Sequence, residues 1–289
     1  MQPPALTREN KHMSTASKIT SAEALRAKAD WVRRETLMIH KIAPETRVAS
    51  SLSPVEIFTA LYYGGVVAFD PQQPYWGARD RVVISKGHGS LSMYPLLADL
   101  GFFPMSELQN VCREGSFLGG IPDPIIPGYE TVNGSLGHGV GVACGMAKAL
   151  QVLSKKQDVF VVTGDGELHE GSIWEGFLFA GHHKLDNLTV VVDRNRHCML
   201  GATENVIGLE PLEDKFRAFG FEVCTVDGHD VNAVKDAMLN FKSSRQGRPK
   251  AIIALTLKGK GAPQLETNPL SHITGLKPAE IDEILKGGK

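Results

Sequence analysis

The sequence lacks any apolar run approaching the roughly 18 residues of a membrane-spanning helix, and its N-terminus lacks the hydrophobic segment of a signal peptide. Cysteine is scarce: Cys112, Cys144, Cys198 and Cys224 form no C-x-x-C pair and no His/Cys cluster at zinc spacing. Such scattered cysteines fit a reduced, cytoplasmic compartment. The formal net charge is only −1, which removes any overall electrostatic case for binding nucleic acid or an anionic membrane.

Hydrophobic residues make up 42% of the 289 residues, enough for a substantial core in one large domain or two small ones. Residues 1–17 are polar and aperiodic, and a second methionine, Met13, follows His12. We therefore expect a disordered leader or an expression-tag remnant over 1–17. No internal repeat or low-complexity linker divides the remainder, so 18–289 is predicted to form one domain.

Short runs rich in Val, Ile and Leu alternate with helical patterns. The runs at 81–85, 158–164, 187–195, 221–228 and 250–259 indicate buried strands. Helices are expected over 21–42, 53–63, 91–100, 141–153, 168–185, 211–219 and 231–243, with Ser53 as the N-cap of the second and Pro54 at its first position. Near-continuous apolar strands alternating with helices predict an α/β domain: a doubly wound, mostly parallel sheet with helices on both faces.

The stretch VFVVTGDGELHEG, 159–171, leaves a buried strand through an acid between two glycines. Asp165 stands at that strand's carboxyl end, and Asn195 stands at the end of the next strand, after one helical crossover. If the two strands are neighbours, their oxygen donors converge where open parallel sheets bind ligands. With a backbone carbonyl, a water and two phosphate oxygens, they would complete the octahedral shell of Mg²⁺. Gly164 and Gly166 would let the main chain approach a diphosphate, aided by the amides opening the helix at Leu168.

This arrangement resembles the thiamine diphosphate motif, GDG followed after just under thirty residues by N, in the form found in the transketolase family. The similarity continues in SKGHGSLSMYPLLADLGFF, GYETVNGSLGHGVGVACGMA and TLKGKGAPQLETNPLSH, and it spans about 25–275 in the family's order. The resemblance therefore implies the diphosphate-binding domain of a transketolase, with thiamine diphosphate and Mg²⁺, or Ca²⁺ or Mn²⁺, as cofactors.

The resemblance also implies roles for individual residues. Asp165, Asn195 and the main-chain carbonyl of His197 match the metal ligands. Gly164, Gly166 and Glu167 belong to the cofactor-binding motif, and Gly134 and Leu136 match the loop that contacts the aminopyrimidine. His88 and His272 match histidines near the diphosphate and the reacting centre, and Glu170 matches an acid that communicates between paired cofactor sites. We expect His88, His272 and Glu170 to be the catalytic residues.

Transketolases carry a diphosphate domain, a pyrimidine domain and a C-terminal domain, and they are roughly twice this length. In the family, the glutamate that protonates the aminopyrimidine belongs to the pyrimidine domain, which this chain does not contain. We therefore expect a split enzyme. This chain would be its N-terminal subunit, inactive alone, and a separately encoded C-terminal subunit would bring the pyrimidine domain in an α2β2 assembly.

Two departures from the family concern the substrate. Arg47, in TRVASSLS, and Ile121, in LGGIPDP, stand where the family has histidines that face the donor ketose. Arginine suits a carboxylate, sulfonate or phosphate, and an apolar replacement removes a hydroxyl partner. We therefore expect a two-carbon ketol or acyl transfer to an aldehyde acceptor with a non-standard donor or acceptor, such as a modified or acidic sugar or a 2-oxo acid. An alternative is that Arg47 points away or pairs with Glu45.

Other functions stay open at this point. One is the α-subunit of a 2-oxo-acid dehydrogenase E1 or an acyloin-type synthase, although the GSLGHG and KGKG blocks favour transketolase. Another is a non-catalytic partner subunit that holds the cofactor. A simple NAD enzyme is disfavoured, because GHGVGVACG does not fit the G-x-G-x-x-G fingerprint.

Overall fold

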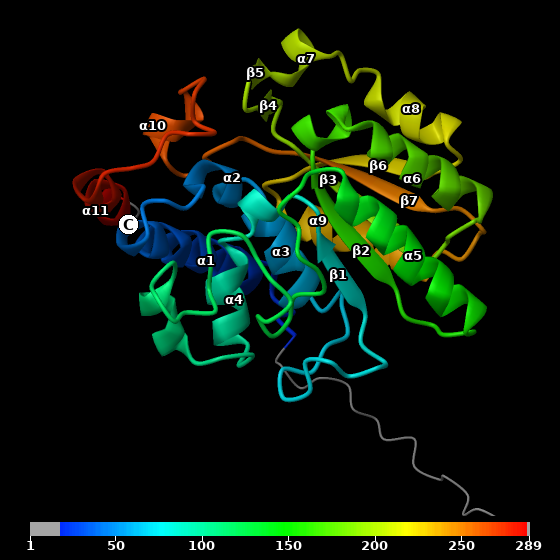
Figure 1. Cartoon of the computed structure of the whole chain (residues 1–289), viewed down its shortest axis with the longest axis horizontal. Coiled ribbons are helices and arrows are strands. Elements are labelled where there is room, and N and C mark those ends of the chain that lie inside the picture. The colour runs from blue at the N-terminus through cyan, green and yellow to red at the C-terminus, as the bar shows by residue number, and fades with distance from the viewer. Residues whose placement is uncertain (1–17, 288–289) are drawn as a thin grey trace, which may run out of the picture.

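The structure is a computed structural model that describes residues 18–287. The predicted leader over 1–17 lies outside the described residues. Five strands form one sheet in the order β1-β2-β3-β7-β6, and every neighbouring pair is parallel (Figure 1). Their bounds are Arg81–Ile84 (β1), Val159–Gly164 (β2), Leu188–Arg194 (β3), Glu222–Asp227 (β6) and Lys250–Leu255 (β7). The predicted parallel α/β sheet is confirmed.

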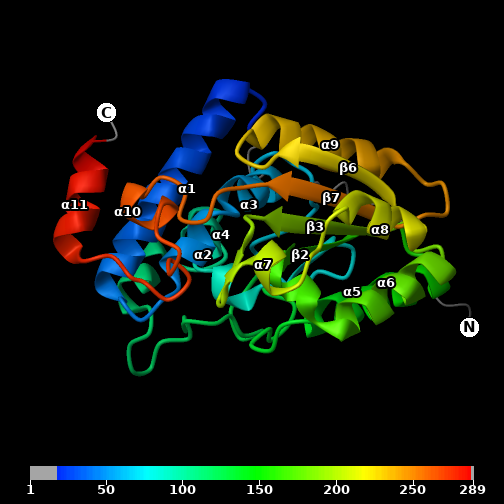
Figure 2. The ribbon, with the colours of Figure 1, turned by 90° about the horizontal axis from the view of Figure 1, so that it is seen from above.

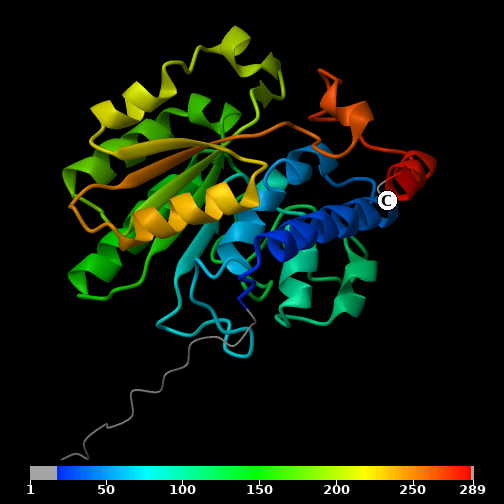
Figure 3. The same ribbon diagram turned by 180° about the vertical axis from the view of Figure 1, so that it is seen from behind.

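Helices cover both faces of the sheet, and Figures 2 and 3 show the two layers. One face packs against α5 (His138–Val152), α6 (Gly171–His182) and α8 (Leu212–Ala218). The other packs against α1 (Ala22–Ile42), α3 (Val55–Tyr62) and α9 (Val231–Ser243). Side chains alternate along β2, because successive residues of a strand point to opposite faces. Val159 and Val161 pack on the face covered by α5, α6 and α8, and Phe160 and Val162 pack on the face covered by α1, α3 and α9.

Shorter elements complete the domain. They are α2 (Val48–Leu52), α4 (Met93–Asp99), α7 (Thr203–Val206), α10 (Pro263–Glu266), α11 (Pro278–Gly287), the 3₁₀ turns Gly87–Gly89, Met105–Asn110 and Gly166–His169, and the antiparallel pair His197–Cys198 (β4) and Gly201–Ala202 (β5). A third core, between α1, α2, α10 and α11, holds the C-terminal segment on α1. Within residues 18–287, no helix combines the length and the apolar character that a bilayer crossing requires.

Two local predictions were wrong. Ser53 is not an N-cap: it follows the unpredicted helix α2, Pro54 caps α3, and the Ser53 hydroxyl donates to the buried carboxylate of Asp193 at 2.6 Å. The helix expected from Leu168 is interrupted after a 3₁₀ turn, and α6 begins at Gly171. Glu170 is therefore the extended N-cap residue of α6, not a residue one turn inside a helix.

Candidate active site

A cavity of about 520 Å³ opens where β2 and β3 end. Every residue predicted to be catalytic, cofactor-binding or metal-binding lines it: His88, Gly134, Leu136, Gly164, Asp165, Gly166, Glu167, Glu170, Asn195, His197 and His272. The two residues predicted to bind substrate, Arg47 and Ile121, are not among its lining residues. The structure thus brings residues from distant parts of the sequence to one place, while their individual roles stay predictions.

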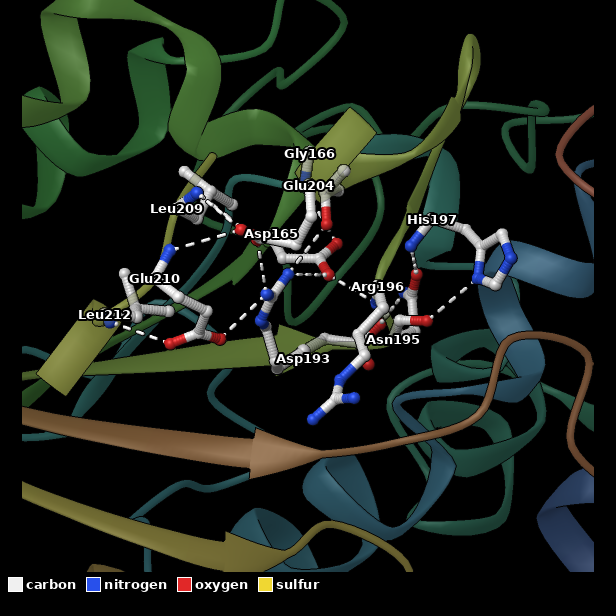
Figure 4. A network of polar contacts seen from close by, with 12 residues as sticks. Asp165, Gly166, Asp193, Asn195, Arg196, His197, Glu204, Leu209, Glu210 and Leu212 are labelled. Carbon is white, nitrogen blue, oxygen red and sulfur yellow. Dashed lines mark hydrogen bonds and ion pairs between the residues drawn. The ribbon is translucent and has the colours of Figure 1, made fainter. Parts of the chain in front are cut away.

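Asp165 and Asn195 occupy adjacent strand ends, because β2 and β3 are hydrogen-bonded neighbours with Gly164 opposite Asp193. The Asp165 carboxylate is buried, and Figure 4 shows the polar groups that contact it. Its Oδ1 accepts a hydrogen bond from the amide of Gly166 at 2.8 Å, and its Oδ2 accepts from the guanidinium of Arg194 at 3.0 Å and from the amide of Arg196. Burial and the nearby Asp193 raise the pKa of Asp165, and the bonds from Arg194 and Arg196 oppose that rise.

The side-chain amide of Asn195 is held in one orientation. Its Nδ2 donates to Asp193 at 3.3 Å, and its Oδ1 accepts from the amide of His197 at 3.1 Å. Among the described residues, no group of three His, Cys, Asp or Glu side chains could hold a metal, so an ion here needs amide and main-chain oxygens as well. The carboxylate, amide and carbonyl oxygens of Asp165, Asn195 and His197 are the hard donors that Mg²⁺ takes, and they fit such an ion.

The glycines and Glu167 shape the wall around these donors. A Cβ atom on Gly166 would come within 2.6 Å of the Cβ of Cys198, so the close approach of the two segments requires glycine there. Glu167 is buried, and its carboxylate accepts from the amides of Gly137 at 2.9 Å and Gly164 at 3.1 Å and from the hydroxyl of Ser85. It therefore joins the loop before α5 to the end of β2, which fixes the cavity wall.

Two neutral histidines face each other in the cavity. The ring centroids of His88 and His272 are 5.0 Å apart, and Lys258 donates to Nδ1 of His272 at 2.9 Å. Burial lowers the pKa of His88 to about 2, and burial with the charge of Lys258 lowers the pKa of His272 to about 4. Both rings are therefore neutral near pH 7, and each keeps an unprotonated nitrogen that can accept a hydrogen bond.

Comparison with known proteins decides the family. The family model described as transketolase, thiamine diphosphate binding domain, matches residues 45–287. This chain belongs to the transketolase family. It is 39% identical to the 6-deoxy-6-sulfo-D-fructose transketolase subunit SqwG of Clostridium sp. (strain MSTE9), over 86% of this chain and 90% of that one. It is 37% identical to an apulose-4-phosphate transketolase subunit of Actinobacillus succinogenes, over 92% and 96%.

Solved transketolases have the same fold. The transketolase of Campylobacter jejuni superposes with a TM-score of 0.85 at 31% identity, over 92% of this chain and 42% of that one. This chain thus spans less than half of that enzyme but most of the two relatives named as subunits. The predictions of the α/β fold and of a transketolase-type, thiamine-diphosphate-dependent transferase subunit are confirmed.

Sequence reasoning missed two buried lysines of this transketolase domain. Lys86 donates to the carboxylate of Asp193, which also accepts from Ser53 and Thr256. Lys258 is only 3% exposed and bonds to neutral acceptors: the ring of His272 and the main-chain oxygen of His197 at 3.4 Å. Burial, together with the charge of Lys86, lowers the pKa of Lys258 to about 8. Lys86 lies in the block SKGHGS and Lys258 in the block KGKG. Each follows a predicted strand, and this position at a strand end was the signal that could have placed them at the site.

An apolar rim surrounds part of the cavity mouth. It is formed by Met199, Leu200, Val206 and Ile207, all of which line the cavity. Leu200 is 74% exposed and Ile207 is 58% exposed. Exposed apolar side chains gathered beside a cavity are typical of a surface that another molecule covers.

Arg47 and Ile121 are both exposed, outside the cavity. Arg47 precedes α2, and its positive charge contributes to the low pKa of His272. The alternative in which Arg47 pairs with Glu45 is not seen, since no ion pair joins these two described residues. Ile121 belongs to the glycine- and proline-rich segment before α5.

Proposed function

We propose that this chain is the N-terminal subunit of a two-component transketolase that moves a two-carbon ketol unit from a keto donor to an aldehyde acceptor. The observation that carries the proposal is the convergence of Asp165 and Asn195 at adjacent strand ends inside one cavity. The relatives named as transketolase subunits, which this chain matches over most of their length, support the two-component arrangement. A cytoplasmic location stays a prediction.

The cofactor would be held through a metal. Asp165, Asn195 and the carbonyl of His197 would bind Mg²⁺, or Ca²⁺ or Mn²⁺, and the ion would hold the diphosphate. Thiamine diphosphate supplies a carbon centre that stabilises the negative charge left when the donor is cleaved. The chain's own part would be to hold the diphosphate beside Gly164 and Gly166, where the main chain can approach it closely.

Lys258 supports an anionic ligand in this cavity. Among the described residues, no carboxylate forms an ion pair with it, although its side chain is almost fully buried in the cavity wall. A buried ammonium without a counter-charge is unfavourable. A diphosphate bound next to Asp165 would supply that charge, so the cavity is electrostatically suited to the proposed cofactor.

The neutral histidines and Glu170 complete the proposed chemistry. His88 and His272 would exchange protons with the oxygen atoms of the donor and acceptor as bonds to them are made and broken. Glu170 is exposed at the N-terminus of α6 and lines the cavity, so its carboxylate is free to reach beyond this chain. We assign it the proposed communication with a second cofactor site.

A separately encoded subunit would close the cavity. The apolar rim, Met199, Leu200, Val206 and Ile207, lies at the mouth, where a pyrimidine domain would have to sit to reach the cofactor. Two copies of each subunit would give the α2β2 assembly. The partner would provide the catalytic glutamate of the pyrimidine domain.

The purified chain is expected to bind thiamine diphosphate only with a divalent ion present and to transfer no ketol unit by itself. Adding the partner chain should restore transfer, because the partner completes the site. Calorimetry with and without EDTA measures binding, and product analysis measures transfer. Turnover by this chain alone would contradict the two-component proposal. Binding without turnover in the complete assembly would favour a non-catalytic subunit, and acyl-lipoyl or acyloin products would favour the dehydrogenase or synthase alternative.

The donor or acceptor would be an acidic or modified sugar. Two relatives are named for a sulfonated fructose and for apulose 4-phosphate. In this chain Arg47 is exposed and forms no side-chain ion pair among the described residues. Its guanidinium could therefore bind a sulfonate or phosphate that extends out of the cavity. A 2-oxo acid is the second class with the same negative charge.

Changing Arg47→His together with Ile121→His should move the reconstituted enzyme toward ordinary ketose phosphates. We expect their kcat/KM, relative to that of a sulfonated or carboxylated sugar, to rise about tenfold, because hydroxyl pairing is regained and the guanidinium is lost. Competition between the two donors measures the ratio. Arg26→His, on the exposed side of α1, is the control and should leave the ratio unchanged. An unchanged ratio in the double variant would remove both residues from donor selection.

A further inference from the structure

Arg194, the last residue of β3, connects the proposed metal site to the segment 203–212. Its side chain is 1% exposed. One terminal nitrogen donates to Oδ2 of Asp165 at 3.0 Å and to the hydroxyl of Thr203 at 2.8 Å. The other donates to Glu204 at 2.7 Å and to Glu210 at 2.9 Å (Figure 4). A single buried guanidinium is thus shared by three carboxylates.

The two outer carboxylates organise the backbone of this segment. Glu204 accepts hydrogen bonds from the amide of Leu209 at 3.1 and 3.2 Å, and Glu210 accepts from the amide of Leu212 at 2.9 Å (Figure 4). The segment contains Ile207, which belongs to the apolar rim of the cavity. The main-chain oxygen of Ile207 also contacts the ring of His169 at 3.0 Å, and the rest of that part of the rim is held by the carboxylates that Arg194 binds.

The charges of the cluster suit a divalent ion. A guanidinium bonded directly to a metal-binding carboxylate would by itself repel the ion. Here Glu204 and Glu210 more than offset Arg194, so the one positive and three negative groups of this cluster have a net charge of −2. Neither Glu204 nor Glu210 lines the cavity. Their effect on the ion would pass through Arg194.

We propose that Arg194 is a positioning residue that couples the Asp165 carboxylate to the segment 203–212, so that metal binding and ordering of the segment strengthen each other. The contacts form an unbroken chain from Asp165 through Arg194 to Glu204 and Glu210, without an intervening solvent gap. Because coupling between two sites is reciprocal, a change at either end must be felt at the other. The metal half of this inference rests on the proposed function; the segment half does not.

The segment half is tested by hydrogen exchange in the full chain without metal or cofactor. Asp165→Ala removes the inner anchor of Arg194 and is expected to accelerate exchange of the Leu209 and Leu212 amides by about tenfold or more. Asp158→Ala is the matched control: it alters a buried acid at the opposite end of β2 that pairs with Arg245, and it should leave these amides unchanged. Equal exchange in wild type and Asp165→Ala would overturn the coupling, whatever the chain binds.

The metal half is tested with Mn²⁺ in the presence of thiamine diphosphate, followed by electron paramagnetic resonance. The double variant Glu204→Gln/Glu210→Gln should bind Mn²⁺ about tenfold more weakly, which is within the range observed when residues that support a metal ligand are removed. Glu213→Gln/Asp214→Asn removes the same charge from the exposed pairs of Arg217 and should change affinity less than twofold. Equal affinity in both double variants would overturn the metal half. A wild-type chain that binds no Mn²⁺ would refute the proposed function instead, and the exchange result would still decide the coupling.

Discussion

Lys86→Met is expected to lower the free energy of unfolding by about 3–5 kcal/mol, the range for breaking a buried ion pair from one side. The Lys86 ammonium and the Asp193 carboxylate are almost completely buried against each other. Burial alone would raise the pKa of Asp193, but the charge of Lys86 and the bonds from Lys86, Ser53 and Thr256 hold it below its usual value. Without the lysine, a charged carboxylate would remain in the core with hydrogen bonds but no counter-charge.

Chemical denaturation of the purified chain measures this effect, and Lys250→Met is the matched control. Lys250 is also buried, at the opposite end of the sheet, but it donates to the main-chain oxygens of Asp186 and Ser244 and forms no ion pair among the described residues. Its loss should cost about 1–3 kcal/mol. Adding Asp193→Asn to Lys86→Met should recover part of the stability, because the buried charge then disappears. Equal losses in the two lysine variants would show that Asp193 does not need its counter-charge.

Asp165→Asn is expected to weaken metal-dependent binding of thiamine diphosphate strongly. Losing a residue that only hydrogen-bonds to a metal ligand costs roughly 10–100-fold in metal affinity, and losing the ligand itself should cost more. The carboxylate is the one charged oxygen donor in the proposed set, since Asn195 and His197 offer neutral oxygens. An amide keeps the size of the side chain and removes the charge that a divalent cation requires.

Asp158→Asn provides the comparison. Asp158 is a buried acid directly before β2, paired with Arg245 at 2.7 Å, at the end of that strand opposite Asp165. Its replacement should lower stability while leaving cofactor affinity unchanged. Calorimetric titration at saturating Mg²⁺, with thermal unfolding of each variant, separates the two effects. Full cofactor affinity in Asp165→Asn would contradict the assignment of the metal site.

The proposed enzyme divides its chemistry between two chains. This subunit would hold the diphosphate end of the cofactor beside two neutral histidines, and its cavity mouth carries exposed apolar residues such as Leu200 and Ile207. A buried site of this kind is completed only when another surface excludes water from it. The coupling through Arg194 would make the order of Ile207 and its neighbours depend on the metal site, so the loaded subunit would present a more ordered rim than the empty one.

Much of the site could be predicted from the sequence, because Asp165 and Asn195 end two strands that are joined by a single helical crossover. When two neighbouring strands are parallel, their carboxyl ends lie at the same edge of the sheet. Oxygen-bearing side chains that end two such apolar runs must therefore lie close together. Asp165 and Asn195 follow this rule, and the glycines beside Asp165 indicate a close approach of the main chain. His88 and His272 lie in the blocks that resemble the transketolase family, and no local sequence pattern indicates that the two rings come together.

Local patterns were less informative where tertiary contacts compete with them. Ser53 and Pro54 have the sequence of a helix start, yet the hydroxyl bonds to Asp193, 140 residues away, because a buried carboxylate binds it more strongly than a helix amide. Glu170 precedes α6 rather than lying within it, because Asp165 begins a separate 3₁₀ turn. Arg47 is predicted at a substrate position by the family resemblance alone, and it does not line the cavity.

The parallel sheet and the pair of oxygen donors at its edge follow from the amino-acid pattern, because strand periodicity and one crossover leave few other arrangements. The charges around those donors depend instead on how distant segments pack together. Lys258 comes to the cavity with no carboxylate partner among the described residues, and Arg194 joins Asp165 to Glu204 and Glu210. Charged side chains reach several ångströms from the backbone, so their partners depend on the packing of distant segments, which no spacing along the chain records.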